Sequence, residues 1–132
     1  MKRFAFRKKE RLANKKIIEH LFLTGKEIFV FPIKIIWMPI TLPFDVPLQT
    51  SFSVPKKIFH KASDRNRIRR RMREAFRLNK HSFYEVLKNK NCGIAMMIIY
   101  SSKKEISFIE IEKKLFLLLE KFKSEIITNF NC

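Results

Sequence analysis

Glycine, cysteine and acidic residues are scarce in this sequence of 132 residues. The two glycines, Gly25 and Gly93, are too few to build a glycine-rich loop that cradles a phosphate. The two cysteines, Cys92 and Cys132, form neither a disulfide framework nor a metal-ligand pattern, so we expect a free thiol at Cys92 and a reducing, cytoplasmic compartment. The three histidines are scattered and no carboxylate pair has metal-binding spacing, so we expect no catalytic centre and no metal site in the protein itself.

A long hydrophobic run is also missing. The longest uncharged apolar stretch, Ile35 to Phe44, is about half as long as a membrane helix and contains two prolines. The first residues of the chain are studded with charge and lack the apolar stretch of an export signal. We therefore expect no transmembrane segment, no export signal and no membrane partner.

Positive charge is abundant where negative charge is scarce. The chain has 29 Lys and Arg against 12 Asp and Glu, a formal net charge of +17, yet 46% of its residues are hydrophobic. This hydrophobic content excludes a disordered tail, and a folded core with so much positive charge repels itself unless it meets a polyanion. Residues 1–80 hold 21 of the 29 basic residues. The sequence therefore predicts a nucleic-acid-binding protein whose binding face lies in the first two thirds of the chain.

Hydrophobic spacing predicts helices and strands in the order α, β, β, α, β, α. Helices are expected from apolar stripes over 14–24, 64–79 and 107–126. Asn14 and Asp64 are the expected N-caps of the first two helices, and Gly25 is the expected C-cap of the first. Strands are expected from alternation or from uniform apolarity over 29–37, 49–55 and 92–100.

The expected elements combine into one α+β domain with helices packed on a small sheet. We expect the first two strands to pair as a hairpin and the third to be the central, most buried one. A further short strand over 26–30 also fits the pattern. The domain is expected to span residues 1–132, with flexible tails at 1–10 and 127–132.

The second expected helix carries the densest charge in the chain. Seven arginines lie within thirteen residues, and only Glu74 offsets them: Arg65, Arg67, Arg69, Arg70, Arg71, Arg73 and Arg77. At 100° per residue, most of them form one arc beside an apolar stripe that includes Ile68 and Met72. Arginine makes paired hydrogen bonds to phosphate oxygens and stacks on bases, whereas lysine supplies only charge. The helix is therefore expected to pack with one face and bind RNA with another.

Two adjacent lysines precede this helix. The segment Ser51 to Lys57, SFSVPKK, ends a strand in Lys56 and Lys57, and a short connection that includes Lys61 leads into the helix. We expect these lysines to share one surface with the arginines.

Together, these two segments resemble the protein subunit of bacterial ribonuclease P. In that family, a strand ending in Lys-Lys is followed by an Arg-Asn-Arg helix; here SFSVPKK is followed, after seven residues, by RNRIRRRMREAFRLNK. The segment RLANKKIIEHLFLTG resembles the first helix of the family. The resemblance covers roughly residues 10–122.

The resemblance implies both a fold and a function. The fold is an α-β sandwich with a left-handed βαβ crossover through the Arg-Asn-Arg helix, although general handedness rules favour the opposite hand. The function is that of a partner of a catalytic RNA, which removes the 5′ leader from precursor transfer RNA by hydrolysis that depends on Mg²⁺. The Mg²⁺ would be bound mainly by the RNA, one protein would bind each RNA, and the protein alone would be inactive.

The charge pattern and the resemblance predict two sets of site residues. RNA would be bound by Lys56, Lys57, Lys61, Arg65, Asn66, Arg67, Arg69, Arg70, Arg73 and Arg77. A cleft for the single-stranded leader, between the first helix and the sheet, would be lined by Ile18, Phe22, Ile36, Trp37 and Phe52. For Phe22 and Trp37, a simple core position is the alternative.

Other functions explain only part of the pattern. A different RNA-binding protein, such as a ribosomal or assembly protein, would share the charge and size but not the spacing of the Lys-Lys and Arg-Asn-Arg segments. A DNA-reading helix would mix polar base-reading residues with the basic ones. The identity of the RNA that co-purifies with the protein would separate these alternatives.

Overall fold

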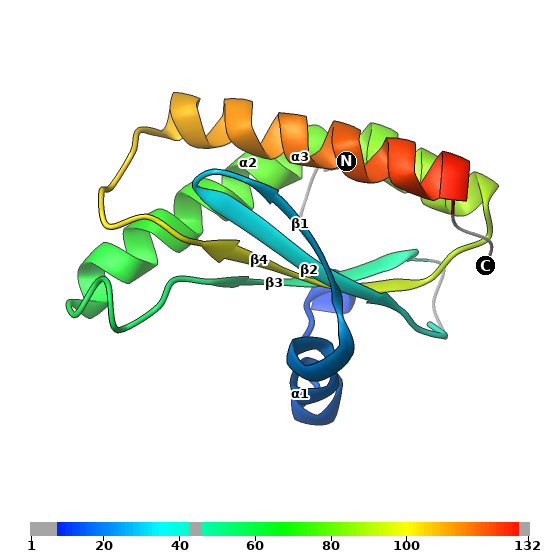
Figure 1. Ribbon diagram of the computed structural model, residues 1–132, viewed down its shortest axis with the longest axis horizontal. Helices are drawn as coiled ribbons and strands as arrows, with labels where there is room; N and C mark the ends of the chain where they lie inside the picture. The colour runs from blue at the N-terminus through cyan, green and yellow to red at the C-terminus, as the bar shows by residue number, and fades with distance from the viewer. Residues whose placement is uncertain (1–7, 43–45, 130–132) are drawn as a thin grey trace.

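A computed structural model describes residues 8–42 and 46–129 of the protein. In this part of the chain the elements are η1 (Lys8–Glu10), α1 (Lys15–Thr24), β1 (Lys26–Val30), β2 (Ile33–Pro39), β3 (Leu48–Ser53), α2 (Ala62–Asn89), β4 (Ile94–Tyr100) and α3 (Phe108–Asn129). The strands form one sheet in the order β1-β2-β4-β3. Helices α2 and α3 cover one face of the sheet and α1 lies on the other, as Figure 1 shows. The expected α+β sandwich is confirmed.

Only one pair of strands in the sheet is parallel. Strand β2 pairs antiparallel with both β1 and β4, whereas β3 pairs parallel with β4. Because α2 connects β3 to β4, these elements form the expected βαβ crossover, whose left hand stays a prediction. The expected hairpin between 29–37 and 49–55 is wrong. The strand that is buried on both faces, β4, lies between β2 and β3 instead.

The region 26–39 is itself a hairpin and not a single strand. The alternation over 29–37 is interrupted at Phe31 and Pro32, where the chain turns and β2 runs back along β1 with Val30 opposite Ile33. Proline lacks the N–H that a strand donates to its neighbour, so it suits this turn. The short strand expected at 26–30 is confirmed as β1.

Hydrophobic side chains fill both sides of the sheet. On the side of α2 and α3, the larger cluster includes Ile68 and Phe76 from α2 and Leu115 from α3, all fully buried. On the other side, Leu21 of α1 joins a smaller cluster with Ile36 of the sheet. All residues of β4 are buried, which confirms it as the central strand.

Helix α1 has the expected ends, set by a side chain and by a close contact. Asn14 Oδ1 accepts hydrogen bonds from the backbone N–H groups of Lys16 and Ile17 at 3.0 and 3.2 Å. At the other end, a Cβ on Gly25 would lie 2.4 Å from the carbonyl oxygen of Leu21, so only glycine fits there. Helix α3 also follows the expectation, extending slightly further along the chain.

Helix α2 is much longer than expected. It begins at Ala62, two residues before the expected cap Asp64, and ends at Asn89 instead of near residue 79. Its buried stripe continues through Phe83, Tyr84 and Leu87. These residues continue the helical spacing of Met72 and Phe76, so the sequence carried the signal for the longer helix.

The N-terminal segment closes the free edge of β3. Arg11 forms a parallel bridge with Thr50, and the Leu12 N–H donates to the Thr50 carbonyl at 2.9 Å. Buried Glu10 accepts hydrogen bonds through one carboxylate oxygen from Lys80 Nζ and Tyr84 Oη, both at 2.6 Å. This segment is therefore part of the packed structure.

Parts of the expected tails belong to elements of the fold. Residues 8–10 form η1 with Glu10 buried, and α3 continues to Asn129. Each of these two segments is next in sequence to residues that pair with the sheet or pack in the core. The remaining tail residues, 1–7 and 130–132, lie outside the described residues.

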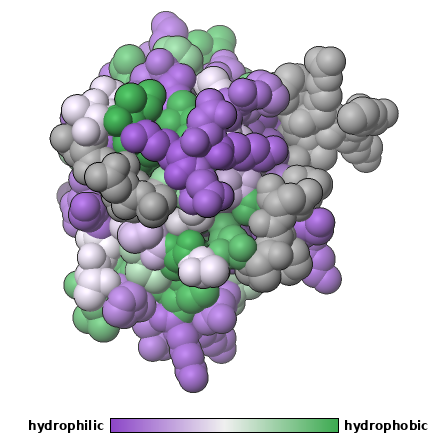
Figure 2. Space-filling view, turned by 90° about the vertical axis from the view of Figure 1, so that its right-hand side faces the viewer, coloured by the Kyte–Doolittle hydropathy of each residue, from purple (hydrophilic) through white to green (hydrophobic). Residues whose placement is uncertain are grey.

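The end of the molecule where α2 finishes has a hollow with a mixed lining, to which Thr41, Lys88 and Asn91 contribute polar groups. Its lining includes Pro39, Ile40, Leu42, Val46, Leu87 and Cys92. Figure 2 looks onto this end and shows hydrophobic and hydrophilic side chains interleaved on the surface. The lysines that precede α2 lie at the other end of the sheet, so this hollow is separate from them (Figure 1).

Two expectations drawn from composition concern the cysteines and membrane-spanning helices. Cys92 is disulfide-bonded, so the expectation of a free thiol is wrong, and its partner lies outside the described residues. None of the helices in the described ranges has the length and apolar character needed to span a membrane.

Candidate nucleic-acid interface

The connection between β3 and α2 presents lysines to solvent. Lys56, Lys57 and Lys61 are exposed there, and in the described part of the chain none of them forms an ion pair with a carboxylate. The next basic residues along the chain are the arginines of α2.

These arginines divide between the two flanks of the helix. Arg69 and Arg73 are one turn apart on the flank toward β3, where the guanidinium carbon of Arg73 lies 5.9 Å from the centre of the Phe52 ring. Arg67 and Arg71 are on the flank toward α3 and the loop before it. Arg70 is exposed.

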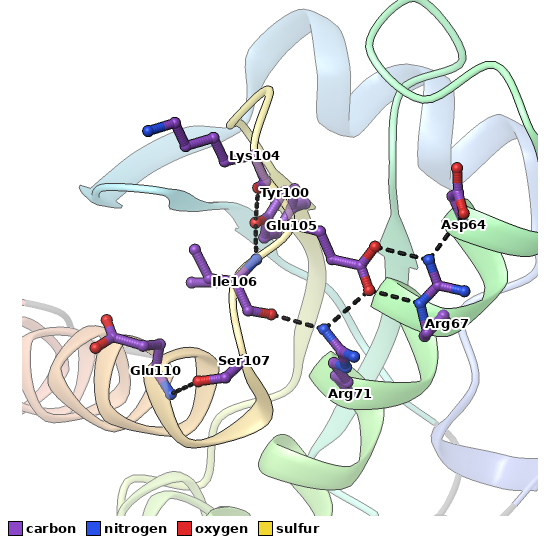
Figure 3. A network of polar contacts seen from close by, with 9 residues as sticks. All are labelled: Asp64, Arg67, Arg71, Tyr100, Lys104, Glu105, Ile106, Ser107 and Glu110. Atoms are coloured by element: carbon purple, nitrogen blue, oxygen red, sulfur yellow. Dashed lines mark hydrogen bonds and ion pairs between the residues drawn. The ribbon is translucent and has the colours of Figure 1, made fainter.

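The flank toward α3 is neutralised by carboxylates, as Figure 3 shows. Arg67 forms two hydrogen bonds with Glu105, from Nε at 2.5 Å and from Nη2 at 2.7 Å, and a third with Asp64 at 2.8 Å. Arg71 Nη1 lies 3.0 Å from Glu105 and donates to the Ile106 carbonyl at 2.7 Å. We call Arg67, Arg71 and Glu105 the loop clamp, because they hold the loop between β4 and α3 against α2.

Tyr100 fixes the backbone on both sides of Glu105. Its hydroxyl accepts from the Ile106 N–H at 3.1 Å and donates to the Lys104 carbonyl (Figure 3). Burial raises the pKa of Tyr100, whereas the hydrogen bonds from Arg67 lower the pKa of Glu105 and raise the pKa of Arg67 itself. The carboxylate is therefore held in place and ionised beside the two arginines.

Two further arginines of the predicted RNA-binding set have partners within the protein. Arg65 Nη1 donates to the carbonyls of Phe59 and His60, both at 2.8 Å, and so fixes the end of the connection before α2. Arg77 forms two hydrogen bonds with Glu74 and lowers the pKa of that carboxyl.

The remaining basic residues of the set have no carboxylate partner in the described ranges. Arg69 donates a hydrogen bond to Asn66, which is neutral, and Arg73 stacks near Phe52. We define the basic face as Lys56, Lys57, Lys61, Arg69, Arg70 and Arg73. The structure thus separates this face from Arg65, Arg67 and Arg77, which are bonded within the fold.

The five residues predicted to line one leader cleft lie on two sides of the sheet. Ile18 and Ile36 belong to the cluster under α1, and Phe22 of α1 is 56% exposed. Trp37 and Phe52 are buried on the opposite side, where their rings pack against Phe122 and Phe76 with centroids 4.8 and 6.0 Å apart. Because neighbouring residues of a strand face opposite ways, Ile36 and Trp37 cannot line the same cleft.

Sequence reasoning missed the residues that accompany Ile36 on the face under α1. Ile36 is paired with Met97 of β4, and Met97 is paired with Ser51 of β3, so these three form a row across the sheet. Strand alternation gives their direction, but the row could not be found without knowing that β4 separates β2 from β3.

Comparisons with known proteins agree with this arrangement. A family model described as Ribonuclease P matches residues 6–123. A "Ribonuclease P protein component" from Porphyromonas gingivalis is 32% identical over 109 residues, which cover 81% of this chain and 80% of that relative. This chain belongs to the ribonuclease P protein family. Both the Lys-Lys and the Arg-Asn-Arg segments lie inside the matched residues, so the alternative of a ribosomal or assembly protein is set aside.

Solved structures of ribonuclease P proteins share the fold. The protein from Staphylococcus aureus has a TM-score of 0.69 at 18% identity, covering 86% of this chain and 95% of its own. The protein from Thermotoga maritima has a TM-score of 0.63 at 24% identity, covering 85% of this chain and 96% of its own. These likenesses support the architecture of a ribonuclease P protein.

Proposed function

We propose that this protein is the RNA-binding subunit of a ribonuclease P ribonucleoprotein. It binds the catalytic RNA through the basic face and holds the leader of precursor transfer RNA on the sheet face beside α1. It thereby assists the RNA in cutting off the 5′ leader. One protein acts with each catalytic RNA, in the cytoplasm.

One observation carries this proposal: the charge on α2 is neutralised on one flank and left open on the other. Glu105 and Asp64 neutralise Arg67 and Arg71 on the flank toward α3. Among the described residues, no member of the basic face forms an ion pair, although Arg70 lines a pocket with Glu74, which is itself paired with Arg77. Like charges gathered on one face repel unless an anion lies between them. A phosphate backbone supplies that anion, and arginine matches its oxygens with paired hydrogen bonds.

The face beside α1 suits a single-stranded leader. Phe22 is an exposed aromatic ring one helical turn from Ile18, and Ile18 packs against the cluster that includes Ile36. Aromatic rings on a positively charged surface bind single strands because every base can stack on them. The leader is the single-stranded part of the precursor, so this surface distinguishes precursor from mature transfer RNA.

The Mg²⁺ that the reaction needs is proposed to be held by the catalytic RNA. Within the described ranges, no group of three or more His, Cys, Asp or Glu is placed to hold a metal ion, so the protein's own residues do not fit such a site. The proposed role of the protein is therefore to bind and orient RNA.

Reconstitution tests the proposal. The purified protein alone should leave precursor transfer RNA intact, and adding the cognate catalytic RNA with Mg²⁺ should give leader removal. Cleavage by the protein alone, surviving RNase inhibitor and RNA depletion, would reverse the assignment. Failure to stimulate the cognate catalytic RNA at physiological salt would count equally against it.

The salt dependence of RNA binding tests the basic face itself. If its six residues each neutralise one phosphate, the slope of log affinity against log salt should be roughly −4 to −5, because each contact adds about −0.7 to −0.9. A slope shallower than about −2 would show that other residues make the main contact.

A further inference from the structure

An exposed pair of aromatic rings projects from the β1–β2 hairpin. Phe29 is 48% exposed and Phe31 is 61% exposed. Their ring centroids are 6.3 Å apart and their planes are at 77°, so they are in edge-to-face contact with each other. Neither the core clusters nor the proposed leader residues include this pair.

Strand register places Phe29 on the same face of the sheet as α1. Ile28 belongs to the core under α3, so its neighbour Phe29 faces the other way. Phe29 is paired with Lys34, Lys34 with Ile99, and Ile99 with Ser53, which gives a row of side chains from β1 to β3.

This row runs alongside the proposed leader surface. It lies two residues along each strand from the row of Ile36, Met97 and Ser51, a distance of about 7 Å. On β3, the row ends at Ser53, just before the connection that carries Lys56 and Lys57. Figure 1 shows the β1–β2 turn and the start of α2 at the same end of the sheet, with α1 under the middle of the strands.

The β1–β2 hairpin and the loop that contacts its turn carry lysines near the aromatic pair, one of which, Lys34, lies 4.0 Å from Glu27. Lys34 is the cross-strand neighbour of Phe29. The Ser101 N–H donates to the Pro32 carbonyl at 2.7 Å, so the loop after β4, with exposed Lys103 and Lys104, contacts the turn that carries Phe31. Exposed rings among cations are the combination that binds single-stranded nucleic acid by stacking and charge.

We propose that Phe29 and Phe31 form a base-stacking platform that extends the leader path to the edge of the sheet. The platform binds nucleotides of the leader beyond those held beside α1, so its occupant is single-stranded RNA. This inference rests on the proposed function. It adds that Phe29 and Phe31 strengthen the binding of precursors whose leaders are long enough to reach them.

The test compares precursors that differ only in leader length. The protein is assembled with its catalytic RNA, and affinities are measured for precursors with a long leader, for precursors with a very short leader and for mature transfer RNA. A double variant, Phe29→Ala with Phe31→Ala, should weaken binding of the long-leader precursor by at least roughly fivefold, since each lost stack has that effect or more. Affinities for the short-leader precursor and for mature transfer RNA should not change.

Matched variants separate stacking from other effects. Phe116→Ala removes a ring that is also 48% exposed, but from α3 on the opposite side of the sheet, and should leave all three affinities unchanged. Phe29→Tyr with Phe31→Tyr should keep the long-leader affinity, whereas leucine at both positions should lose it because an aliphatic side chain has no ring to stack.

Three results would overturn the platform. One is a wild-type protein that binds long and short leaders equally. Another is a double alanine variant that loses affinity equally for all three RNAs, and the third is a leucine variant as good as wild type, which would indicate an apolar protein contact instead. The proposed function fails separately, if the wild-type protein does not support leader removal by its catalytic RNA.

Discussion

Arg69 and Arg73 differ from Arg67 in what surrounds their guanidinium groups, although all three lie within two turns of α2. Replacing Arg69 and Arg73 together by alanine removes charge from the basic face and leaves the buried stripe of the helix intact. The thermal midpoint should therefore change little. Affinity for the catalytic RNA should fall, and the salt slope should become shallower by about 0.7 to 0.9 for each arginine. Binding titrations at several salt concentrations measure both effects.

Arg67→Ala is the matched control, because it removes the same side chain from the other flank. Arg67 bonds to Glu105 and Asp64 within the protein, so its loss should lower the thermal midpoint and leave the salt slope unchanged. A salt slope that drops for Arg67→Ala as much as for an arginine of the basic face would show that the RNA displaces Glu105.

Phe22 offers a second test at the level of one side chain. Because its ring is 56% exposed, Phe22→Ala should change the thermal midpoint only slightly. If the ring stacks on a leader base, the variant should lose roughly 1–3 kcal/mol of affinity for precursor and none for mature transfer RNA. A lowered midpoint with an unchanged precursor-to-mature ratio would instead make Phe22 structural.

The entry into α3 depends on the loop clamp, which predicts a response to pH. Arg67 lowers the pKa of Glu105 from its ordinary value of 4.5. Since the folded state favours the ionised carboxyl, the clamp stabilises the fold fully above about pH 4.5, and this contribution is lost as the pH falls through the lowered pKa. The thermal midpoint of wild type should therefore exceed that of Glu105→Gln near neutral pH, and the gap should narrow in acid.

Glu110→Gln serves as the control for the clamp. Glu110 lies in the first turn of α3, directly after the loop that carries Glu105, but makes no ion pair among the described residues. Its variant should stay much closer to wild type than Glu105→Gln near neutral pH, because the Glu110 carboxylate gains only the weak field of the helix N-terminus. If the difference in thermal midpoint between wild type and Glu105→Gln stayed constant down to acid pH, the loop clamp would not act through the charge of Glu105.

At the scale of the elements, the sequence predicted the ends of α1 and the buried strand correctly, because interactions within each element decide them. The expected caps Asn14 and Gly25 and the apolar run of β4 each identified an element correctly, because the cause lies within the element. Strand pairing depends instead on partners far along the chain. The expected hairpin was therefore wrong, since nothing in 29–37 or 49–55 shows that β4 lies between them.

The candidate site was predictable to the same extent. Charge and spacing identified the arginine helix and the lysines before it, but could not tell which arginines have carboxylate partners. Glu105 is far from Arg67 in sequence and reaches it only because the loop before α3 folds onto α2. Trp37 and Phe52 were misplaced for a similar reason, because the direction of a strand residue depends on which face each helix covers.

In the molecule as a whole, a buried ion pair joins the N-terminal segment at the edge of β3 to α2. Glu10 in η1 and Lys80 in α2 are almost completely buried, and Tyr84 bonds to the same carboxylate oxygen. Glu10→Ala should cost roughly 3–5 kcal/mol of stability, because it removes the carboxylate that compensates a buried ammonium. Urea unfolding measures this loss, and Glu19→Ala on the exposed side of α1 is the control. A loss below about 1 kcal/mol would show that Lys80 is compensated in another way.

The same ion pair also sets the order in which parts of the protein dock during synthesis. Glu10 leaves the ribosome before its partners Lys80 and Tyr84, which follow 70 and 74 residues later. Contacts between residues so distant in sequence form late, because a long loop must close first. The segment that closes the edge of β3 therefore docks only after the second half of α2 has been made.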